Sequence, residues 1–112
     1  MQSISLTTLA GEHLAAARRA TSGRSARIIH GGRENALRQT LLALAAGRRL
    51  DGHDNPGEAT LQVLRGHVRL ATSRDTWEGT AGDYLVIRPE RHDVTAIEHS
   101  AVLLTVVARL RP

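Results

Sequence analysis

Two histidines, His53 and His92, stand out in this sequence as residues that could carry chemistry. Histidine changes its charge near neutral pH, so it serves as a general acid or base, and its ring nitrogens bind zinc, iron, nickel and manganese. His53 lies in a polar segment with Asn55 and Glu58 close by, and His92 follows the turn sequence RPER. The question is whether these groups form one site.

The composition indicates one soluble globular domain. The chain has 112 residues, 41% of them hydrophobic and 23% charged, and no cysteine. The lack of cysteine excludes disulfides, thiolate catalysis and cysteine-based zinc sites. No apolar run approaches the roughly 18 residues of a transmembrane helix, and the N-terminus has neither a basic start nor a long apolar centre. We therefore expect no signal peptide, no membrane partner and a cytoplasmic location.

The positive charge invites a nucleic-acid function, which we discount. The net charge is +4, and the sequence pI is near 11.2. All of the basic residues are arginine, at most two are adjacent, and aromatic residues make up only 2% of the chain. A basic patch with aromatic platforms, on which bases could stack, is therefore missing. We expect no nucleic-acid partner.

Residues 6–20 have the period of an amphipathic helix. Ser5 is a candidate N-cap, and TSGRS (residues 21–25) is a candidate stop signal. The apolar positions fall on one face: Leu6, Leu9, Ala10, Leu14, Ala17 and Ala20. We assign residues 1–25 to an N-terminal amphipathic helix that packs on the rest of the chain or on a partner.

After residue 25 the hydrophobic period changes to two, as in strands. Short apolar runs alternate with glycine turns, including a hairpin signal at Arg65-Gly66. The segment at residues 35–47 fits a strand ending at Gly47. It also fits a helix, because leucine and alanine favour helices, and both interpretations stay open. Many short strands with glycine turns predict a sandwich or barrel of the jelly-roll type.

Two motifs follow one another along the chain. The first, from Gly47 to Gly66, has the length and apolar rhythm of the pattern G-x5-H-x-H-x3,4-E-x6-G, with His53 at the first histidine. The second, GDYLVIRPERH, runs from Gly82 to His92. Together they resemble the motifs of the cupin family, across about residues 27–107. The resemblance implies a mainly β fold: a single cupin-type (RmlC-like) jelly-roll β-barrel over residues 26–112, with a short N-terminal α-helix.

In metal-binding cupins the two motifs supply two histidines, a glutamate and a further histidine. On this resemblance His53 matches the first histidine and His92 the last. Asn55 and Ala59 stand where the second histidine and the glutamate would be. The resemblance thus implies His53 and His92 as the metal ligands of an incomplete site, for zinc, iron, nickel or manganese.

These ligands are too few for an ordinary catalytic metal site, which keeps three protein ligands. Asn55 offers only a neutral amide oxygen, which suits such metals poorly. Glu58 is adjacent to Ala59, so on a strand the two side chains point to opposite faces. We expect no tightly bound cofactor, and a divalent transition metal remains the alternative.

By strand parity, Ala59, Leu61 and Val63 share one face, and Thr60, Gln62 and Leu64 share the other. We expect a small-molecule pocket lined by His53, Asn55, Leu61, Val63 and His92. If the barrel is catalytic without a metal, His53 and His92 are the candidate general base and acid. The rival interpretation is that these histidines only hydrogen-bond neighbouring groups.

Three classes of function stay open. The first is a small bacterial cupin-domain protein that binds a small molecule in its barrel, with no assignable reaction. The second is a cupin enzyme of the oxygenase or isomerase type, metal-dependent or metal-free, which uses His53 and His92. The third is a structural or interaction protein. Many small cupins are homodimers, so the resemblance also implies a homodimer, for which the helix is a candidate packing element.

Overall fold

The structure is a computed structural model that describes residues 1–32, 34–53 and 57–108, with the backbone alone for residues 52 and 53. Its one described helix, α1, spans Leu6–Arg19. The described strands are β1 (Arg24–His30), β2 (Leu37–Leu44), β3 (Arg49–His53), β4 (Ala59–Arg65), β5 (His67–Ala71), β6 (Thr76–Thr80), β7 (Tyr84–Ile87), β8 (His92–Ala96) and β9 (Ser100–Val107).

The strands form two antiparallel sheets, with the orders β1-β2-β9-β4-β7 and β3-β8-β5-β6. Between β2 and β9 the chain crosses from one sheet to the other at every connection except the β5–β6 hairpin. This is the strand order of a double-sheet jelly roll. No described pairing joins a strand of one sheet to a strand of the other. The fold is therefore described as a mainly β, two-sheet sandwich, and the closed barrel stays a prediction.

The core lies between the two sheets. On β4, Ala59, Leu61 and Val63 are all buried, while Gln62 between them is exposed. The expected parity of this strand is therefore confirmed. The inward residues of β4 meet those of β5 and β8, which include Val68, Leu70, Val94 and Ala96.

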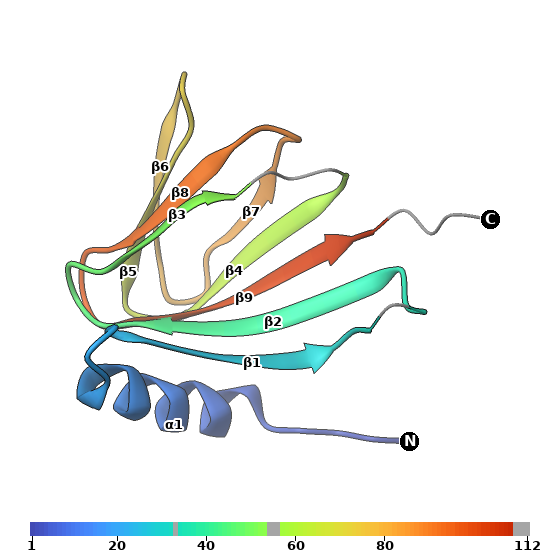
Figure 1. The fold of residues 1–112 in the computed structure, drawn as a ribbon, viewed down its shortest axis with the longest axis vertical. Helices are drawn as coiled ribbons and strands as arrows, with labels where there is room; N and C mark the ends of the chain where they lie inside the picture. Colours follow the sequence, from blue (N-terminus) through green and yellow to red (C-terminus); the bar gives the residue numbers. More distant parts are fainter. Residues whose placement is uncertain (33, 54–56, 109–112) are drawn as a thin grey trace.

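Helix α1 packs against the outer face of the five-stranded sheet (Figure 1). Ser5 is its N-cap, as expected, and its hydroxyl accepts a hydrogen bond from the Thr8 backbone N–H at 3.2 Å. Leu9 and Ala10 contact Leu41 and Ala101 of the sheet. The helix ends one residue earlier than expected, with Ala20 as its C-cap. No helix in the described part of the chain is long and apolar enough to cross a membrane.

The open question about residues 35–47 is settled in favour of a strand. β2 pairs with β1 on one side and with β9 on the other. Four consecutive residues, Leu41 to Leu44, are all buried. This continuous apolar run arises because the inner face of β2 meets the sandwich core while its outer face meets α1.

The outer face of the four-stranded sheet carries an exposed cluster of charges. The Glu78 carboxylate accepts hydrogen bonds from His67 at 2.8 Å and Arg69 at 3.2 Å. The hydrogen bond from His67, followed by that from Arg69, lowers the pKa of Glu78 below its ordinary value. The outer face of β5 therefore takes part in a cross-strand network at the surface.

Gly66 makes the tight turn between β4 and β5, in the left-handed region with φ +88°. A Cβ added there would lie 2.3 Å from both the His99 carbonyl oxygen and the Ser100 hydroxyl. That hydroxyl also accepts a hydrogen bond from the His67 backbone N–H at 2.9 Å. The β4–β5 turn is therefore pressed against the start of β9, without space for a side chain.

We expect Gly66→Ala to lower the free energy of unfolding by about 3 kcal/mol or more, because strain and overlap add. Gly47→Ala is the matched control, since Gly47 also has a positive φ (+82°) but open space around it. It should cost only about 1 kcal/mol. Urea denaturation of the two variants measures the difference, and equal losses would contradict the packing described for Gly66.

Candidate functional site

His92 begins β8 and faces the inside of the sandwich. Its side chain is 5% exposed, and it alternates along the strand with the core residues Val94 and Ala96. Its Nδ1 lies 3.3 Å from the Glu90 carbonyl oxygen. Because a carbonyl oxygen can only accept, this contact assigns the ring hydrogen to Nδ1, and in the neutral ring the lone pair is then on Nε2.

His53 is the last residue of β3, and its backbone pairs directly with that of His92 on β8. The register between these strands is irregular after Leu50. The structure therefore brings the two predicted histidines to neighbouring strands. The side chain of His53 and the whole of Asn55 lie outside the described residues.

The other residues predicted for the site lie on β4. Ala59 is buried and borders a surface hollow. Leu61 and Val63, at 1% and 0% exposure, belong to the main core. Neither of them lines the four hollows described for this part of the chain. Their part in ligand binding stays a prediction.

The described residues do not fit a three-ligand metal site. Ala59 presents a methyl group where the resemblance would require a carboxylate, and that methyl group packs in the core. Among the residues whose side chains are described, no three histidine, aspartate or glutamate groups are placed to hold a metal ion. Of the histidines with described side chains, His92 is the one that faces inward, and one ligand is too few for a metal.

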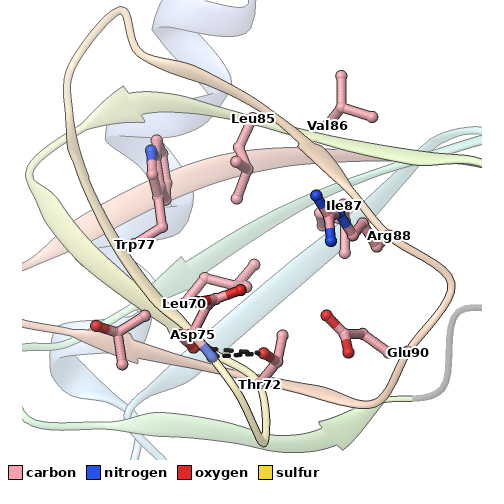
Figure 2. Close-up of a pocket in the computed structure, with 10 residues that line it drawn as sticks. Leu70, Thr72, Asp75, Trp77, Leu85, Val86, Ile87, Arg88 and Glu90 are labelled. Carbon is pink, nitrogen blue, oxygen red and sulfur yellow. Dashed lines mark hydrogen bonds between the residues drawn. The ribbon is translucent and has the colours of Figure 1, made fainter.

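A hollow of about 150 Å³ opens between β5, β6 and β7 (Figure 2). We call it the open-end hollow. Its apolar wall consists of Leu70, Trp77, Leu85 and Ile87, with Val86 beside them. Its polar rim consists of Thr72, Asp75, Thr76, Arg88 and Glu90. An apolar wall with a polar rim is typical of a small-molecule pocket.

A neighbouring glycine positions the indole ring of Trp77. Trp77 and Gly79 are two residues apart on β6 and so share a face. A Cβ added at Gly79 would lie only 2.2 Å from the Trp77 ring. The ring therefore lies over Gly79, while the register of the β5–β6 hairpin pairs Trp77 with Leu70.

Two hydrogen-bonded turns carry the charged residues of the rim. In the β5–β6 turn, the Thr72 N–H donates to the Asp75 carbonyl at 2.9 Å, and the Asp75 N–H donates to the Thr72 hydroxyl at 3.1 Å. Across the hollow, the Glu90 N–H donates to the Arg88 carbonyl at 2.7 Å. This is a three-residue γ-turn centred on Pro89. Figure 2 shows Arg88 and Glu90 along one side of the hollow and Trp77 on the other.

Two further hollows adjoin this one. A hollow of about 270 Å³ contains His92 and shares Thr72 and Glu90 with it. A third, of about 790 Å³, contains Ala59 and shares Ile87 and Arg88. The Arg88–Glu90 turn thus lies where all three meet.

Sequence reasoning identified His92 and Ala59 but did not group the residues that line the open-end hollow. The missed residues are Asp75, Trp77, Arg88 and Glu90. Three of them, Asp75, Arg88 and Glu90, are charged residues next to the ends of strands. This position is a signal in the sequence, because loops at strand ends carry binding groups.

We expect Gly79→Ala to force the Trp77 ring out of its place. Overpacking of this kind costs about 1–3 kcal/mol, and the ring should move toward the open-end hollow. Trp77 is the only tryptophan of the chain, so its emission spectrum reports the movement directly. Gly11→Ala on α1 is the control, since a Cβ there meets its nearest neighbour at 3.4 Å. An unchanged spectrum in Gly79→Ala would contradict the contact.

Comparisons with known proteins concern the fold. No protein-family profile and no curated protein matches this sequence. A cupin superfamily protein from Desulfitobacterium hafniense is similar in structure, with a TM-score of 0.77 and 12% identity over 96% of this chain and 92% of that one. An RmlC-like cupin from Desulfovibrio desulfuricans has a TM-score of 0.66 and 22% identity, over 75% and 81% of the chains.

One similar structure is that of a named enzyme. The DMSP lyase DddQ from Ruegeria pomeroyi has a TM-score of 0.68 and 14% identity, and the match covers 80% of this chain and 49% of that one. At such identities the likeness concerns the fold alone, and folds of this kind carry unrelated functions.

Proposed function

This chain has the cupin fold, and we propose that it is a small-molecule-binding protein whose site is the open end of its sandwich. The observation that carries the proposal is the open-end hollow, with an apolar wall and a rim of charged groups fixed by two turns. Concave sites of this composition are where proteins hold small ligands.

Binding without a metal-dependent reaction is favoured over catalysis by the residues at the motif positions. Ala59 supplies no donor, and His92 is the one inward histidine whose side chain is described. A hollow with an aromatic wall and fixed charges needs no metal to select a ligand.

An enzyme is the second candidate function, because one observation favours it. His53 and His92 are direct neighbours in the β3–β8 register, although they lie far apart in the sequence. Two histidines side by side would suit general base and general acid catalysis. DddQ, which is named as a lyase, has the same fold.

Thermal-shift measurements with a chemically diverse set of small molecules test the binding proposal. At least one compound should raise the melting temperature of the wild type by several degrees, since ligands stabilise the state that binds them. Leu85 faces inward on β7 and lines the open-end hollow, so Leu85→Phe should place a ring in that space and abolish the shift.

Gln62→Phe is the matched control, because Gln62 is exposed on β4 and lines none of the described hollows. Its shift should equal that of the wild type. Equal shifts in both variants would place the ligand elsewhere, and no shift with any compound would contradict the binding proposal.

A metal analysis separates the two candidate functions. Protein purified without chelator should contain no stoichiometric zinc, iron, nickel or manganese, because the motif positions supply too few ligands. Ala59→Glu supplies the missing carboxylate. Without metal it should lose about 3 kcal/mol of stability, since a charge is buried, and added zinc should restore part of that loss.

Stoichiometric metal in the wild type that disappears in both His53→Ala and His92→Ala would overturn the preferred function and favour the enzyme. The wild type is the control for Ala59→Glu. Added zinc should change neither its stability nor its metal content. If zinc fails to stabilise that variant, the assignment of Ala59 to the vacant ligand position is wrong.

A further inference from the structure

We propose that the ligand of the open-end hollow is a small zwitterion, a molecule of few heavy atoms that carries both an organic cation and a carboxylate. This inference rests on the proposed function and names the class of ligand. The open-end hollow presents an aromatic ring, two carboxylates and a guanidinium around one apolar wall.

The size of the hollow limits the ligand. Its volume of about 150 Å³ is below the roughly 300–1,000 Å³ usual for drug-sized ligands. The adjoining hollow that contains His92 adds about 270 Å³. A compact molecule of amino-acid size fits this space.

The cationic group has three candidate partners around the hollow, two carboxylates and an aromatic ring. Asp75 and Glu90 both line the hollow, and neither carboxylate forms an ion pair in the described part of the chain. Trp77 is partly buried in the wall, held there by the space over Gly79. A tryptophan face attracts organic cations, and nearby carboxylates strengthen that attraction.

The anionic group has partners on β7 and the turn that follows it. The guanidinium of Arg88 has five N–H donors in a planar fork, a geometry that suits a carboxylate. Figure 2 shows its nitrogen atoms beside Ile87, on the same side as Glu90.

The backbone of Val86 adds a donor. The Asp83 carbonyl accepts a hydrogen bond from the Val63 N–H at 2.9 Å, and the β4–β7 register continues without a shift to Ala59 and Ile87. In an antiparallel pair, bonded positions alternate. Asp83, Leu85 and Ile87 therefore bond to β4. The N–H of Val86 is directed toward the free edge of the sheet, beside the hollow that Val86 lines.

A ligand of one charge would satisfy only part of this rim. A simple carboxylate would be attracted by Arg88 but repelled by Asp75 and Glu90. A simple ammonium would be attracted by the two carboxylates but repelled by Arg88. Like charges placed together weaken binding and discriminate against wrong partners. A zwitterion complements both groups.

Trp77 fluorescence provides the test, with three probes of similar size. Glycine betaine carries a quaternary ammonium and a carboxylate, choline carries the cation alone, and 3,3-dimethylbutyrate is the betaine isostere without the positive charge. Betaine should change the emission and bind at least about tenfold more tightly than either of the others, as expected for charge-assisted contacts at both ends.

Substitutions on the rim separate the two ends. Arg88→Gln should weaken betaine by about tenfold and leave choline unchanged or tighter. Asp75→Asn with Glu90→Gln should weaken betaine and choline but not 3,3-dimethylbutyrate. Glu98→Gln, at an exposed carboxylate that lines none of the described hollows, is the matched control and should change nothing.

The outcomes distinguish this inference from the proposed function. Betaine binding no better than both single-charge probes, while some compound still shifts the melting temperature, overturns the zwitterion and leaves the binding function standing. If Leu85→Phe also leaves that shift intact, the open-end site itself fails. Binding of betaine that is indifferent to the rim substitutions overturns the inference as well.

Discussion

The contact of Gly66 with Ser100 is the constraint on which the rest of this structure depends. Gly66 lies in the β4–β5 turn, which passes from the five-stranded to the four-stranded sheet. Ser100 begins β9, and its buried hydroxyl bonds to the backbone N–H of His67 at the start of β5. The two sheets are therefore pinned together at one end. In Figure 1 the strands converge near this junction and fan out from it.

The open-end hollow follows from that constraint. The sheets are joined at the Gly66 end, and the open-end hollow lies away from this junction, between β5, β6 and β7. Among the residues of its wall, Trp77 and Leu85 are only partly buried, while Leu70 and Ile87 are buried. The polar residues that follow these strands, such as Asp75 and Arg88, stand around the gap. A fold that is tight at one end thus presents a recess at the other, and loops around such a recess carry function.

How far the sequence predicts this molecule differs between elements. The helix and its Ser5 cap were predictable, because both signals are local. The parity of β4 was predictable as well, since one of its faces is buried and the other is not. That residues Leu37–Leu44 form a strand, β2, could not be predicted. Both faces of β2 are buried, and the burial of its outer face depends on α1, which packs there. Trp77, Arg88 and Glu90 could not be grouped, because the crossing connections of the jelly roll bring them together and no spacing in the sequence reports this.

Mapping of amide and indole chemical shifts by NMR, during titration with glycine betaine, tests the central claim most directly. The account predicts that the largest shifts occur at Trp77, Val86 and Arg88 around the open-end hollow. Shifts centred instead on the Gly66 end of the core, or spread evenly over the surface without saturation, would contradict it.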